Sequence, residues 1–185
     1  MCTSRVIIAA AVLLAALVPA TSFAQVESTP IPAPRKPDFS SSSFLVGTWT
    51  CSSKSSRRPR AFTTISTYSL DPTGYWMSET STTPKTSWVP TTLRTWDKIT
   101  YDPDANRWVD VSYGDGGGYG LSFSKGWNGN QIVWHDISFV AGPDVNSQTD
   151  ITTVKVSPTK TTSSSSFTET KTGRRVMVAT TCMKG

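Results

Sequence analysis

Histidine and cysteine are scarce in this sequence, which contains one histidine and three cysteines. A zinc site takes about four ligands, and neither an HExxH nor a CxxC pattern is present. Serine is abundant, but no serine lies in a Gly-x-Ser-x-Gly turn, and the glycine run 114–118 lacks the spacing of a phosphate-binding loop. We therefore expect no enzyme, no metal site and no cofactor.

Helical periodicity and strong charge are also missing. Apolar residues do not recur at intervals of three and four, which excludes an extended helical core. The formal charge is +5 for the whole chain and +4 once Arg5 is removed with the leader described below. No face combines clustered Lys and Arg with aromatic residues, so we expect no nucleic-acid partner.

The first 24 residues have the pattern of a secretory signal. A basic start precedes the apolar run 6–18, and small residues occupy the two positions read by a signal peptidase, Ser22 and Ala24. Cleavage is expected before Gln25, and the apolar run is too short for a membrane anchor. The sequence therefore predicts a protein exported to the periplasm or secreted, with no transmembrane segment in the mature chain.

Residues 25–43 are rich in proline and serine and are predicted to form a flexible tether. Residues 44–185 show short strands separated by turns, such as the Asp-Pro-Thr-Gly turn 71–74. This pattern predicts an all-β domain, a closed antiparallel meander barrel of about ten strands. The predicted strands are 44–51, 61–70, 75–82, 91–101, 107–113, 119–125, 131–140, 149–157, 160–171 and 175–183.

Closure of an even meander places the first strand antiparallel to the last. Cys51 and Cys182, which remain after Cys2 is lost with the signal, lie in these two strands. Alternation places Trp49 and Cys51 on one face of the first strand, and Cys182 on the face of the last that we take as interior. Because an exported chain retains disulfides, we predict a Cys51–Cys182 bridge at the seam.

Several short motifs resemble known families. The Gly-x-Trp of the first strand resembles that of lipocalins and the wider calycin group. A longer set, in order along the chain, is similar to small exported bacterial proteins of the DUF1579 type, which are lipocalin-like or nitrobindin-like barrels. The matching residues are Leu45 to Cys51, Tyr101-Asp102-Pro103, Arg107-Trp108-Val109, Val133-Trp134 and Thr181-Cys182.

This resemblance implies a barrel-end plug. Trp49 would close one end, and Gly47 would let the entering backbone pass close by. Calycins bring an Arg or Lys over this Trp, and Lys184, just past the last strand, is the expected cation. Nitrobindin-like proteins hold haem through a histidine near the C-terminus; this chain has none there, so haem is not predicted.

His135, the single histidine, shares the apolar face of its strand with Val133, Ile137 and Phe139, and we expect it to point inward. It would then contact a ligand in the barrel, or be a core histidine satisfied by a hydroxyl or water. The predicted ligand-binding residues are His135, Phe139, Phe123 and Tyr113.

Two further groups are ambiguous from sequence alone. Glu79 and Glu169, with Asp97 or Asp110, would suffice for a carboxylate pair, but we interpret these acids as solvated strand residues. The tryptophans are numerous and are expected to fill the interior or cover sheet faces, with a subset lining a cavity. Besides Trp49, they are Trp76, Trp88, Trp96, Trp108, Trp127 and Trp134.

The loop 52–60 is the most basic stretch, with Lys54, Arg57, Arg58 and Arg60. It is either a solvated loop or a weak contact with anionic envelope components. Our leading hypothesis is an exported binding module that holds a small apolar or amphipathic ligand in its barrel. The alternative is an envelope-associated interaction protein with a filled barrel and a basic contact loop.

Overall fold

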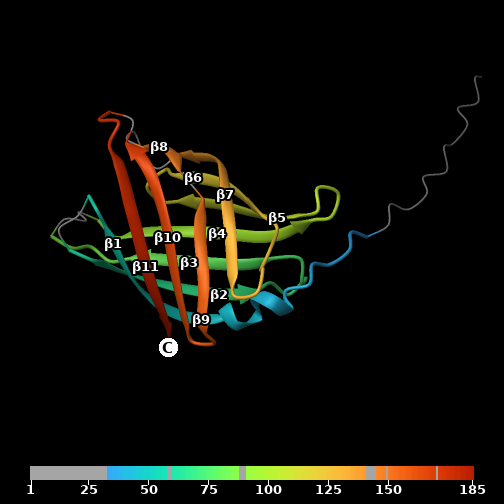
Figure 1. The fold of residues 1–185 in the computed structure, drawn as a ribbon. Coiled ribbons are helices and arrows are strands. Elements are labelled where there is room, and N and C mark those ends of the chain that lie inside the picture. The colour runs from blue at the N-terminus through green and yellow to red at the C-terminus, as the bar shows by residue number, and fades with distance from the viewer. Residues whose placement is uncertain (1–32, 58–59, 88–90, 141–144, 149, 170) are drawn as a thin grey trace, which may run out of the picture. The chain divides into compact units, whose positions relative to one another are not determined.

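The computed structural model describes residues 33–57, 60–87, 91–140, 145–148, 150–169 and 171–185, and for 136–140 and 145–148 it describes the backbone alone. Pro34–Gly185 form one compact unit made almost entirely of strands (Figure 1). Within the described residues, no helix has both the length and the apolar character needed to cross a membrane.

In the described residues the unit contains one short 3-10 helix, η1 (Ser40–Leu45), and eleven strands in a single antiparallel sheet. Each predicted strand overlaps an observed one, and the first begins and ends later in the chain than predicted. The strands are β1 (Gly47–Ser55), β2 (Phe62–Leu70), β3 (Met77–Thr83), β4 (Leu93–Asp102), β5 (Arg107–Gly114), β6 (Tyr119–Ser124), β7 (Gln131–Val140), β8 (Val145–Gln148), β9 (Ile151–Ser157), β10 (Lys160–Glu169) and β11 (Arg175–Lys184).

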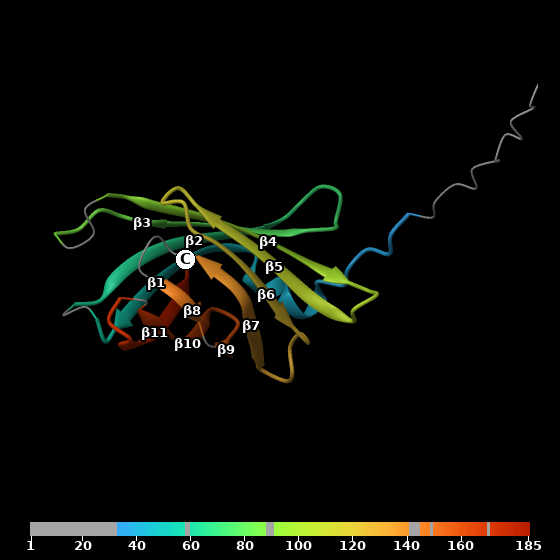
Figure 2. The same cartoon turned by 90° about the horizontal axis from the view of Figure 1, so that it is seen from above.

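Ten of these strands close into a barrel, which confirms the predicted fold class. Neighbours in sequence pair from β1 to β7, then β7 pairs with β9, β9 with β10 and β10 with β11. The pairing of β11 with β1 completes the ring. The sequence did not predict β8, which pairs with the end of β10 beside β9. Seen from above, β3, β4 and β5 face β9, β10 and β11 across the interior (Figure 2).

The predicted seam disulfide is confirmed. Cys51 and Cys182 are directly opposite in the register of β1 and β11, with Cα atoms 3.9 Å apart, and their sulfur atoms are bonded. Burial alternates along β1, with Trp49, Cys51, Ser53 and Ser55 buried and the residues between them exposed. The interior face of this strand is therefore the face that carries the cysteine.

One end of the barrel is covered by η1, and this corrects two predictions. The first strand begins at Gly47, because residues 40–45 form the 3-10 helix. Residues 39–43 were predicted to belong to a flexible tether, yet Phe39 is 7 % exposed and its ring lies 5.2 Å from that of Trp108. Ser42 accepts a hydrogen bond from Trp127 Nε1 at 2.9 Å. These contacts anchor the segment to the barrel end.

Candidate functional site

The interior of the barrel contains a cavity of about 260 Å³. Most strands of the ring and η1 contribute side chains to the cavity. The lining side chains are of three kinds: acidic residues, residues with hydroxyls, and aromatic or aliphatic residues. The lining residues are Ser42, Leu45, Trp49, Cys51, Tyr68, Met77, Glu79, Asp97, Ile99, Trp108, Asp110, Trp127, Ile132, Trp134, Ile151, Thr153, Thr161, Ser163 and Cys182.

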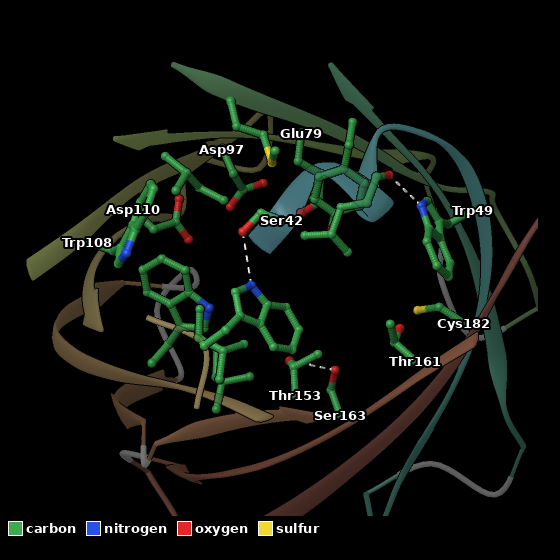
Figure 3. A pocket seen from close by; sticks show the side chains of 18 of the residues that line it. Ser42, Trp49, Glu79, Asp97, Trp108, Asp110, Thr153, Thr161, Ser163 and Cys182 are labelled. Carbon is green, nitrogen blue, oxygen red and sulfur yellow. Dashed lines mark hydrogen bonds between the residues drawn. The ribbon is translucent and has the colours of Figure 1, made fainter. Parts of the chain in front are cut away.

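The acidic group forms one wall of the cavity, on β2 to β5. Tyr68 is directly opposite Glu79, and Glu79 is directly opposite Asp97, so the three side chains form a row across neighbouring strands. Asp110 lies on β5, where it shares the inner face with Trp108. Figure 3 shows the carboxyl groups of Glu79, Asp97 and Asp110 gathered on one side of the cavity. Like charges this close in a sheet destabilise each other.

Burial and mutual repulsion change the protonation of this wall. Burial, followed by the charges of Glu79 and Asp110, raises the pKa of Asp97 to about 9. Burial also raises the pKa of the Tyr68 hydroxyl well above its ordinary value, and the Glu79 carboxylate adds to that shift as a charge and as a hydrogen-bond acceptor. At neutral pH, Asp97 therefore holds a proton and the tyrosine remains neutral.

Hydroxyl groups form the opposite wall, on β9 to β11 and β1. Thr153 and Ser163 are hydrogen-bonded to each other with 2.9 Å between their oxygens, and Ser53 and Thr180 are similarly paired at 2.8 Å. Figure 3 shows Thr153, Thr161 and Ser163 across the cavity from the carboxyl groups. The two pairs, Thr153 with Ser163 and Ser53 with Thr180, are each satisfied internally without any net charge.

Trp49 closes the end of the cavity beneath η1. It is 1 % exposed, and its Nε1 donates a hydrogen bond of 2.6 Å to the carbonyl of Leu45. Lys184, the cation expected from the calycin resemblance, has its Nζ 5.7 Å from the centroid of the Trp49 ring and donates to the carbonyl of Phe44 at 2.9 Å. Gly47 adopts a φ of +123°, and a Cβ there would lie 3.0 Å from Lys184 Cε, so glycine is required.

The ligand-binding residues expected from sequence are not the ones that line the cavity. His135 was predicted to point inward, and this is wrong: its side chain is 58 % exposed and its Nδ1 lies 2.7 Å from Asp150 Oδ1. The inner face of β7 carries Ile132 and Trp134 instead. The sequence is apolar on both faces of this strand, and the prediction chose the wrong one.

Two other predicted ligand-binding residues, Tyr113 and Phe123, also lie outside the cavity lining. Tyr113 is 50 % exposed on the outer face of β5 and stacks on Trp96, with ring centroids 5.4 Å apart. Phe123 lies under the guanidinium of Arg107, whose Cζ is 3.7 Å from the ring centroid. The side chain of Phe139 lies outside the described residues.

The basic stretch is divided between a strand and a loop. Lys54 belongs to β1, which continues to Ser55, and it is exposed. Arg57 is engaged with Glu169, with Nε 2.9 Å from Oε1, and Glu169 is 8 % exposed. Arg60 is exposed, and Arg58 lies outside the described residues. Glu169 is therefore paired with an arginine, and the prediction that it is a solvated acid is wrong.

The interpretation of Glu79, Asp97 and Asp110 as solvated residues is also wrong, since all three line the cavity. The signal that identifies them is alternation along each strand. Met77 precedes Glu79 by two residues, Ile99 follows Asp97 by two, and Trp108 precedes Asp110 by two. Each acid thus shares a face with a large apolar residue, which places it inside if that residue is inside.

Comparison with protein-family models and with curated proteins gave no match to this chain. The resemblance to DUF1579-type proteins stays a prediction. The geometry and chemistry of the cavity are therefore the basis for assigning a function.

Proposed function

We propose that this protein is an exported binding module that holds a small, partly apolar molecule inside its barrel. The observation that carries the proposal is the interior cavity of about 260 Å³ that is lined by four indole side chains. Ligand sites usually occupy about 300–1,000 Å³, so an occupant of this cavity is smaller than a typical drug. The leader and the seam disulfide support export.

The rings provide an apolar surface with defined polar groups around it. Trp49, Trp108, Trp127 and Trp134 all reach the cavity, and three of them are contributed by strands or a loop remote from β1 in sequence. Such a site combines aromatic contact area with a few fixed polar groups, which is the usual composition of a small-molecule pocket. An envelope-associated protein with a filled barrel is less well supported, because the interior is hollow and Arg57 is engaged with Glu169.

A binding experiment tests the proposal. We expect 2-phenylethanol and indole to bind the purified protein saturably, with a change in tryptophan fluorescence and a stoichiometry of about one by calorimetry. Native mass spectrometry of the exported protein would reveal a molecule that copurifies with it. Failure of neutral, cationic and anionic aromatic probes alike to bind saturably would contradict the function.

A blocking variant locates the binding site. Ser163→Phe places a ring in the cavity and is expected to abolish probe binding. Ser164→Phe is the matched control, because Ser164 is the next residue of β10 and its side chain is exposed. Equal loss of binding in both variants, or in neither while both remain folded, would place the probe outside the barrel.

A further inference from the structure

The charges around the cavity are all of one sign. Glu79, Asp97 and Asp110 line it, and its described lining contains no lysine, arginine or histidine. Lys184 lies at the end of the cavity that Trp49 closes, and its Nζ is directed to the Trp49 ring and to the carbonyl of Phe44. An anionic ligand would therefore meet repulsion with no compensating charge, and the cavity selects against it.

Asp97 has an additional property that points to a ligand. Glu79 accepts a hydrogen bond from Ser81 at 2.7 Å and is adjacent to the Tyr68 hydroxyl. In the part of the chain that the structure describes, no side chain or backbone group donates a hydrogen bond to the carboxyl of Asp97. Figure 3 shows this carboxyl directed into the cavity beside those of Glu79 and Asp110. Asp97 is half-buried, and its carboxyl lines the cavity, so a donor from a ligand would complete it.

The aromatic residues favour the same class of ligand. Trp108 shares the inner face of β5 with Asp110, and Trp134 and Trp127 are also exposed to the cavity. The face of an indole attracts an organic cation, and several such rings together with carboxylates recognise ammonium groups. Among the described residues, no set of three His, Cys, Asp or Glu side chains is arranged to hold a metal ion.

We propose that the cavity binds a small organic cation, an amine with an apolar body, whose ammonium group donates to Asp97 between Glu79 and Asp110 and whose apolar part contacts the tryptophans. This inference depends on the proposed binding function and specifies its ligand class. Neither a neutral nor an anionic molecule provides the donor and the charge that this wall lacks.

Binding is then linked to proton release. The titratable groups on this wall with Asp97 are Tyr68 from β2, Glu79 from β3 and Asp110 from β5. The charges of Glu79 and Asp110 favour the protonated form of Asp97, and Tyr68 stays neutral. An ammonium group favours the ionised form, so the carboxyl proton leaves to the solvent as the amine binds. Affinity for the amine should rise by about tenfold per pH unit while Asp97 is protonated in the free protein.

The test uses three probes of similar size and different charge: 2-phenylethylamine, 2-phenylethanol and 3-phenylpropanoate. At pH 8 we expect the amine to bind at least about tenfold more tightly than the alcohol, and the carboxylate not to bind. The preference should weaken between pH 8 and pH 6. Calorimetry at pH 7 in phosphate and in Tris should show about one proton released with the amine and none with the alcohol.

Asp97→Asn is the decisive variant, because it keeps the shape of the side chain and removes the exchangeable charge. We expect this variant to bind the alcohol as before and to lose both the preference for the amine and the proton release. Asp104→Asn is the control, since Asp104 is exposed in the turn between β4 and β5. The proton-release measurement on the unmodified protein tests the same idea without any variant.

The outcomes separate this inference from the binding function. Equal affinity for amine and alcohol, or an amine preference that survives in Asp97→Asn, would overturn the cation proposal and leave the binding function intact. Saturable binding of Ca²⁺ or Zn²⁺ alone that is lost in Asp97→Asn would overturn it in favour of a metal. Absence of binding by all three organic probes would overturn the binding function itself.

Discussion

The two walls of the barrel interior both carry polar groups and satisfy them in different ways. On the wall formed by β9, β10, β11 and β1, the hydroxyls of Thr153 and Ser163 pair with each other, as do those of Ser53 and Thr180. On the wall formed by β2 to β5, the directly opposed groups are Glu79 and Asp97, which repel each other when both are ionised.

This difference shows where binding chemistry can be located in a small barrel. A hydroxyl is both donor and acceptor, so neighbouring hydroxyls complete each other and have no further need of a ligand. Carboxylates are acceptors only, and a cluster of them requires protons or a cation from elsewhere. The wall formed by β9, β10, β11 and β1, here called the neutral wall, is therefore suited to closing the barrel. The wall formed by β2 to β5, the acidic wall, is suited to binding a ligand.

The largest expected effect comes from opening the seam on the neutral wall. Replacing both cysteines by serine removes a cross-link between residues 131 positions apart. The chain-entropy model assigns about 4–5 kcal/mol to a loop of this length. We expect the free energy of unfolding, measured by urea denaturation, to fall by about this amount at every pH.

The same variant also tests whether the two walls act separately. The disulfide is uncharged, so its removal leaves the electrostatic interactions of the carboxyl groups unchanged. The slope of the free energy of unfolding against pH should therefore stay as in the parent protein. A slope that disappears with the disulfide would mean that the acidic wall is formed only when the seam is closed.

The acidic wall is expected to produce the second effect, a loss of stability as pH rises. The pKa of Asp97 is raised to about 9 in the folded protein, so the folded state retains a proton that the unfolded state has lost above about pH 4. The stability contribution is thus fully present at low pH and declines toward pH 9. Between pH 5 and 8, the free energy of unfolding should fall by at most about 1.4 kcal/mol per pH unit.

Asp97→Asn should flatten this dependence and raise the melting temperature at pH 8 by several degrees. The exposed control Asp104→Asn should leave the pH dependence as it is. Thermal unfolding between pH 5 and 8 provides the measurement. If Asp97→Asn melts lower than the parent protein at pH 8, the carboxyl of Asp97 is ionised and stabilised in the native state, and its pKa is not raised.

The sequence was sufficient to predict the closure of the barrel and the disulfide at its seam. The turn 71–74 has Pro and Gly at the positions that a type I turn requires, and its backbone hydrogen bond from Gly74 N to Asp71 O is 3.0 Å long. Alternation in β1 and β11 placed Cys51 and Cys182 on the interior face. Local turn chemistry and a period of two are readable from neighbouring residues alone.

The acidic wall and the covered end could not be read as easily, because tertiary contacts decide them. The serine run of η1 has a polar composition. It is anchored by the hydrogen bond from Trp127 to Ser42 and by the packing of the preceding residue, Phe39, against Trp108, and both tryptophans are distant in the chain. Asp97 is a charged residue type that is usually exposed to solvent. It lines the cavity because the sheet closes around it. Charge was treated as evidence for exposure, and that assumption outweighed the alternation that indicated the interior.

The smallest effect concerns the hydroxyl pairs of the neutral wall. Thr153→Val removes one partner of the pair with Ser163 and keeps the shape of the side chain. A buried hydroxyl that loses its partner costs about 1 kcal/mol, and we expect a loss of that size in urea denaturation. Replacing both residues, as Thr153→Val with Ser163→Ala, should recover part of the loss, because no unpaired hydroxyl then remains. Neither variant should change the slope of stability against pH, since neither alters the charge around Asp97. A changed slope would show that the two walls are coupled across the cavity and do not act separately.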